Sequence, residues 1–164
     1  MIIIPYIKQE RRPALDKVVA AMVDYGICDE NGVVSNSKLS ILFSHLVDNI
    51  LSRPDMSDVY NPIYTDNHHE IVDLMIDSGL KLNGDLNYIL FKFAKYHIKP
   101  SYNNYKMFIS ALEYTVFNTY DSSVYIINEV ILNLCGELNE CVSEIRRKIL
   151  GPYEEKAIER NGDV

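Results

Sequence analysis

Basic and aromatic residues gather near both ends of this 164-residue chain, and together they could hold a phosphorylated ligand. The residues concerned are Tyr6, Lys8, Arg11 and Arg12 near the start, and Arg146, Arg147 and Tyr153 near the end. Arginine can bind phosphate through two parallel N–H donors, and a tyrosine ring offers a flat face to a nucleotide base. Arg146 and Arg147 also have a simpler explanation, because cations in the last turns of a helix complement its dipole.

A row of carboxylates is the second arrangement that could carry chemistry. Glu137, Glu140 and Glu144 are spaced by three and four residues, so a helix would place them on one face. In all-helical nucleotide pyrophosphatases, Glu-x-x-Glu is followed by Glu-x-x-Asp, and these acids bind Mg²⁺. Glu137 and Glu140 match the first pair, but Glu159 and Asp163 are four residues apart and fail to match the second. A solvent-facing helix surface is the simpler interpretation of the row.

The composition favours a folded intracellular protein and argues against a nucleic-acid binder. Hydrophobic residues make up 48% of the chain, and the net charge is −7 with a pI near 5.0. The three cysteines show no metal-binding spacing, and Cys135 and Cys141 would lie too far apart on one helix for a disulfide. The opening Met-Ile-Ile-Ile run is too short for a signal peptide or a membrane span. We therefore expect a cytoplasmic protein that needs no metal or cofactor and binds neither nucleic acid nor membrane.

Apolar periodicity and capping residues predict a series of helices and little strand. Their expected bounds are Ala14–Tyr25, Ser37–Leu51, Asn67–Ser78, Asn83–Ile98, Ser101–Asn118 and Asp121–Leu150. In the last and longest, apolar positions recur at steps of three and four, as on a helix that packs along a partner. These positions are Val124, Ile127, Ile131, Leu134, Leu138, Cys141 and Ile145. Asp121 would cap this helix, and Gly151-Pro152 would end it.

The sequence thus predicts an all-α fold: a single-domain helical bundle over residues 1–164, organised on the long C-terminal helix. Residues 2–7 would form a short extended N-terminal arm, because Pro5 limits any strand there to a sheet edge. Residues 52–66 contain two prolines and many turn formers, which predicts a long loop. Residues 151–164 are polar, and we expect them to dock on the bundle as a tail. The Asn161-Gly162 turn would bring Asp163 back toward the arginines.

Three stretches of the chain resemble a small uncharacterised family of tailed-phage and bacterial proteins. They are Pro5–Arg12 (PYIKQERR), Asn83–Tyr88 (NGDLNY), and Arg146-Arg147 with Pro152–Lys156 (PYEEK) and Asn161–Val164 (NGDV). The resemblance implies a small cytosolic helical protein and points to a phage gene. Its polar segments lie at the ends of expected helices, where residues serve sites more often than cores. On this ground the candidate site also includes Asn87, Tyr88, Asn161 and Asp163.

These observations lead us to expect non-catalytic binding of a phosphorylated small molecule, most of all a nucleotide. The arginines would hold phosphate, and Tyr6, Tyr88 or Tyr153 would stack on the base. In a phage, such binding would sequester a nucleotide immune signal of the host. Two alternatives stay open: an Mg²⁺-dependent nucleotide pyrophosphatase that uses the glutamate row, and a phage protein that inhibits a host protein through residues 52–66. We also expect a homo-oligomer, formed through the long helix or the tyrosines.

Overall fold

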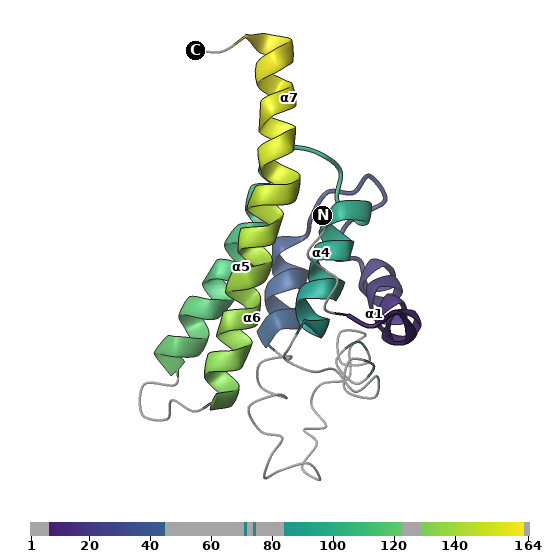
Figure 1. The fold of residues 1–164 in the computed structure, drawn as a ribbon, viewed down its shortest axis with the longest axis vertical. Helices are drawn as coiled ribbons and strands as arrows, with labels where there is room; N and C mark the ends of the chain where they lie inside the picture. Colours follow the sequence, from purple (N-terminus) through teal and green to yellow (C-terminus); the bar gives the residue numbers. More distant parts are fainter. Residues whose placement is uncertain (1–6, 45–70, 72–73, 75–83, 123–128, 163–164) are drawn as a thin grey trace.

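A computed structural model describes residues 7–44, 71, 74, 84–122 and 129–162 of the chain. It is an all-α bundle, as the sequence predicts (Figure 1). The elements are a 3₁₀ turn at Gln9–Arg11 (η2), α1 (Arg12–Tyr25), α4 (Asp85–His97), α5 (Tyr102–Ser122), α6 (Glu129–Ile145), a π-helical segment at Arg146–Leu150 (η3) and α7 (Gly151–Asn161). Residues 36–44 are helical as well. No described helix is both long and apolar enough to cross a membrane.

Several expectations fall on residues that lie outside this description. They concern the N-terminal arm up to Tyr6, the loop at 52–66, most of the helix expected at 67–78, and Asp163. Within that expected helix, Ile71 and Leu74 are described and helical, and Ile71 is buried.

Proline and glycine set the two ends of α1. Pro13 lies in the first turn, where its missing N–H has no helical partner to lose. Gly26 ends the helix with a φ of 91°, a left-handed conformation that suits glycine, and its N–H bonds to the carbonyls of Met22 and Val23. α4 then packs against both α1 and α6.

A buried asparagine fixes the start of α5. Asn104 accepts a hydrogen bond from the N–H of Val34 (3.3 Å) and donates to the carbonyl of Lys99 (3.1 Å). Its own N–H bonds to the hydroxyl of Ser101 (3.1 Å), the first residue of the helix expected here. Asn104 therefore ties the α4–α5 connection to the chain near Val34, and Tyr105 follows it directly.

The apolar face of α6 lies in the centre of the core, as its heptad pattern predicts, and α6 packs against both α4 and α5. Four of its positions are at most 1% exposed: Leu134, Leu138, Cys141 and Ile145. The earlier positions, Val124, Ile127 and Ile131, are not among the side chains that the structure describes. Cys28 and Cys141 are free thiols.

Both expected ends of the last helix are wrong. Asp121 and Ser122 belong to the end of α5 instead of capping a new helix. At the other end, the helix passes through the π segment into α7. The N–H of Gly151 there bonds to the carbonyl of Arg146, five residues earlier. This wider turn leaves room for the ring of Pro152, which in a regular α-helix would clash with the carbonyl four residues earlier.

Residues 151–161 form α7, not the docked tail that the sequence led us to expect. α7 continues from the π segment and projects beyond the bundle (Figure 1). Pro152 is favourable in a first helical turn, and the following Glu154, Glu155 and Lys156 are good helix formers. The polar composition therefore reflects a solvent-exposed helix, and its first turn touches the bundle through Tyr153.

Candidate functional site

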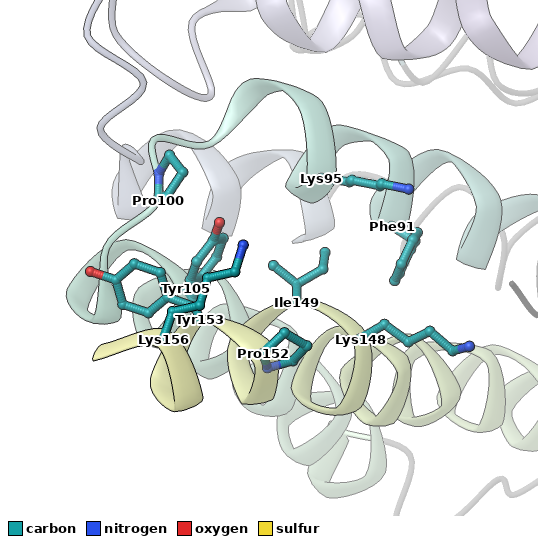
Figure 2. A pocket seen from close by; sticks show the side chains of 9 residues that line it. All are labelled: Phe91, Lys95, Pro100, Tyr105, Lys148, Ile149, Pro152, Tyr153 and Lys156. Carbon is teal, nitrogen blue, oxygen red and sulfur yellow. The ribbon is translucent and has the colours of Figure 1, made fainter. Parts of the chain in front are cut away.

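A pocket of about 340 Å³ lies between α4, the start of α5 and the junction of the π segment with α7 (Figure 2). It is lined by Phe91, Lys95, Pro100, Tyr105, Lys148, Ile149, Pro152, Tyr153 and Lys156. Three lysines and three aromatic rings thus share one space, and none of its described lining residues is acidic. In a chain of net charge −7, this local excess of positive charge favours an anionic ligand.

The wall formed by the C-terminal helix presents two rows of side chains. Lys148, Pro152 and Lys156 follow one another at steps of four residues, and Ile149 and Tyr153 form the adjacent row. The π segment, which contains Lys148 and Ile149, adds one residue to the helical turn before Pro152 and Tyr153. It therefore determines which face of α7 meets the pocket.

Two tyrosines close one end of the pocket. The rings of Tyr105 and Tyr153 meet edge to face, with centroids 5.8 Å apart and planes at 74°. Burial raises the pKa of Tyr105, and the neighbouring Tyr153 adds to this shift. The Tyr105 hydroxyl therefore stays protonated at neutral pH and can donate a hydrogen bond to an anion. On α4, Phe91 and Lys95 are one helical turn apart and face the pocket together (Figure 2).

The beginning of α4 holds a separate polar cluster, which contains several residues of the predicted site. Arg11 pairs with the buried carboxylate of Asp85, and its Nε donates to the same group at 3.3 Å. Glu137 of α6 accepts the N–H groups of Gly84 (2.6 Å) and Asn87 (3.1 Å), so it caps the first turn of α4. Burial raises the pKa of Glu137, although these two N–H groups oppose the shift. The cluster holds the first turn of α4 between α1 and α6.

Tyr88 belongs to the same cluster and packs in the core. Its hydroxyl donates to Asp16 of α1 at 2.8 Å, and the Lys92 ammonium donates to that carboxylate (2.8 Å) and to the Tyr88 hydroxyl (3.2 Å). Burial raises the pKa of Tyr88, and so does its hydrogen bond to Asp16. The ring is 5% exposed, which leaves it no face for a stacked base. Arg12 Nε and Asn87 Oδ1 are buried and lack a hydrogen-bond partner within the described part of the chain.

A family model described as a domain of unknown function, DUF6899, matches residues 4–164. The chain belongs to this family. The matched range contains all three stretches on which the resemblance to an uncharacterised family rests. Neither a curated protein nor a solved structure matches the sequence. Because the description of DUF6899 states no activity, its function has to be inferred from the site.

The arginines near the C-terminal end of this DUF6899 chain lie away from the pocket lining. Arg146 donates to both carboxylate oxygens of Glu113 at 3.2 Å, and Arg147 donates to Glu144 at 2.6 Å. Lys8 is exposed near the N-terminal end, and Asn161 is exposed at the end of α7. Tyr6 and Asp163 lie outside the described residues. Of the predicted site residues that the structure describes, Tyr153 is the one that lines the pocket.

The lysines of the pocket were not among the residues that the sequence predicted for the site. Lys148 and Lys156 are eight residues apart, which would have placed them on one face if the helix had been extended past Gly151 and Pro152. Because Gly151 and Pro152 were expected to end the helix, Lys148 and Lys156 were not recognised as residues of one helix. Lys95 carried no signal of its own, because a lysine near the end of a helix already complements the dipole.

The three glutamates of the row, Glu137, Glu140 and Glu144, have different roles in the structure. Glu137 caps α4, and the buried Glu144 pairs with Arg147, whereas Glu140 is exposed. The prediction of a solvent-facing row thus holds for Glu140 and fails for its two neighbours. Among the described residues, no group of three or more histidine, cysteine, aspartate or glutamate side chains could hold a metal ion.

Proposed function

We propose that this protein binds a phosphorylated small molecule in the lysine-lined pocket without converting it, and that the ligand is a nucleotide. The proposal rests on one pocket with three lysines, three aromatic rings and no acid among its described lining residues. Lysine binds phosphate as a point charge, and aromatic rings pack against flat bases. A volume of about 340 Å³ lies at the small end of ligand pockets, which suits a mononucleotide better than a larger ligand.

Binding without turnover is supported by the side chains that the pocket offers. Its described lining residues include no carboxylate, histidine or cysteine, the groups that most often move protons or attack phosphorus. The pyrophosphatase alternative would need its acids to face the phosphates. Glu137 and Glu144 are instead engaged with the start of α4 and with Arg147.

The family resemblance suggests a biological setting for this activity. A phage protein of this kind would capture a nucleotide signal of its host in the host cytoplasm. Capture requires reversible binding that is tight relative to the ligand concentration, and it requires no chemistry. The expected self-association stays a prediction.

Titration calorimetry with the 5′-monophosphates and 5′-diphosphates of the four ribonucleosides tests the proposal. We expect saturable binding of at least one nucleotide, weakened at least about tenfold in Lys148→Gln, because a charged hydrogen bond contributes about 1.5–3 kcal/mol. Lys17→Gln, at an exposed position of α1, is the matched control and should bind like the wild type. If no nucleotide binds, or if ³¹P NMR shows that the bound nucleotide is consumed, the proposal is wrong.

A further inference from the structure

The ammonium groups of the pocket lie at two opposite ends. In Figure 2, the ammonium group of Lys156 lies at the end marked by Tyr105, whereas those of Lys95 and Lys148 lie at the other end, near Phe91. Lys148 and Lys156 are eight residues apart, which corresponds to about 12 Å along an α-helix. In this arrangement, Lys156 and the pair Lys95 and Lys148 would contact a ligand from opposite ends.

The surface between the two charged ends is apolar. Ile149 and Pro152 lie between them on the C-terminal helix, and Ile149 packs against the hydrophobic core (Figure 2). A charged group placed on this strip would lose hydration without gaining a partner. The strip therefore favours the uncharged and flat part of a ligand, with the ligand's charges directed to the two ends.

We propose that the ligand carries two anionic groups on separate positions, one for each end of the pocket. The class that fits is a nucleoside bisphosphate, with its base and sugar over the apolar strip. One phosphate binds at Lys95 and Lys148, and the other binds at Lys156, where the Tyr105 hydroxyl offers a second donor. This inference rests on the proposed function and narrows its ligand class, because a nucleotide phosphorylated at a single position leaves one cationic end unused.

Binding of three adenosine compounds of graded charge and shape tests the inference. The compounds are adenosine 5′-monophosphate, adenosine 5′-diphosphate and adenosine 3′,5′-bisphosphate, titrated into the wild type, Lys156→Gln, Lys156→Arg and Lys17→Gln. In the wild type, the bisphosphate should bind about tenfold more tightly than either 5′-nucleotide, as expected for one further charged contact. Lys156→Gln should remove this preference, whereas Lys156→Arg and Lys17→Gln should retain it.

The comparison with the 5′-diphosphate separates the position of charge from its amount, because both of its phosphates lie at one end of the molecule. If the diphosphate binds as tightly as the bisphosphate, or if Lys156→Gln keeps the preference, the two-ended ligand is refuted while nucleotide binding stands. If none of the compounds nor any other nucleotide binds, the proposed function is refuted together with this inference. Lys156 is exposed, so its variants should keep the wild-type circular dichroism spectrum.

Discussion

Tyr105 and Tyr153 meet edge to face with ring centroids 5.8 Å apart, and this contact joins the first turns of α5 and α7. Tyr105 is buried and Tyr153 is half-buried. Beyond this point α7 projects away from the bundle (Figure 1). The pair therefore sets where the C-terminal helix leaves the bundle, and it fixes one end of the pocket at the same time.

Tyr153→Ala should weaken nucleotide binding and lower the free energy of unfolding by about 0.5–1.5 kcal/mol for the lost ring pair alone, with the lost buried area adding to that. Tyr153→Phe keeps the ring and is the matched control, so it should retain both properties. Urea melts and titration calorimetry measure the two effects. Wild-type affinity in Tyr153→Ala would show that the ring is not part of the binding surface.

Leu138→Ala should destabilise the bundle by about 2–5 kcal/mol, because it leaves a cavity at a position that is 1% exposed. Leu132→Ala removes the same atoms from a residue of α6 that is 51% exposed, and it should change stability by no more than about 0.5 kcal/mol. Urea melts of both variants compare the two faces of α6. Equal losses would contradict the assignment of Leu138 to the core.

Because of Glu137, the stability of the fold should decrease as the pH rises. Burial holds the pKa of Glu137 above the 4.5 of an ordinary glutamate, because it disfavours the charged form. The folded protein then binds this proton more tightly than the unfolded chain. The contribution to stability is complete below pH 4.5 and is lost as the pH rises through the raised pKa.

In urea melts across this window, wild-type stability should therefore fall with rising pH relative to Glu137→Gln, which cannot titrate but keeps an oxygen that accepts an N–H group. Glu137→Ala, which removes the cap, should cost about 1 kcal/mol. Parallel pH profiles of the wild type and Glu137→Gln would show that the pKa of Glu137 is not raised.

Pro152→Ala should allow the π segment to return to a regular α-helix, because the new N–H can bond to the carbonyl of Lys148. Loss of the extra residue of the π turn would rotate α7 by about 100° about its own axis. This rotation would move Tyr153 and Lys156 away from the pocket. We expect nucleotide binding to fall at least about tenfold while the helical circular dichroism signal is kept. Pro13→Ala, in the first turn of α1, is the control and should bind normally. Unchanged binding in Pro152→Ala would mean that Pro152 does not set the register.

Local patterns predicted most of the fold. The periodicity of Leu134, Leu138, Cys141 and Ile145 identified the buried face of α6, and Ser101 correctly marked the start of α5. These predictions succeeded because burial of a helical face and capping depend on residues that are close in sequence. The prediction at Gly151-Pro152 failed because a π turn can accommodate a proline that an α turn cannot.

The candidate site was harder to predict because its parts meet only in the folded bundle. Lys95 and Lys148 are more than fifty residues apart, and nothing in either local sequence links them. Arg11 and Arg146 looked like phosphate ligands, but their partners Asp85 and Glu113 lie on other helices. Sequence spacing describes one helix face at a time, and a pocket between helices depends on how several faces are brought together.

The capping of α4 by Glu137 has a consequence for the order of folding during synthesis. The cap residue of α4, Gly84, has no side chain to bond the first turn, and the carboxylate that does so lies 53 residues later in the chain. A ribosome therefore releases α4 long before it has made the partner of that turn. α4 can close its first turn in the native way only after α6 has emerged and docked, so the middle of the chain completes its folding when the C-terminal helix arrives.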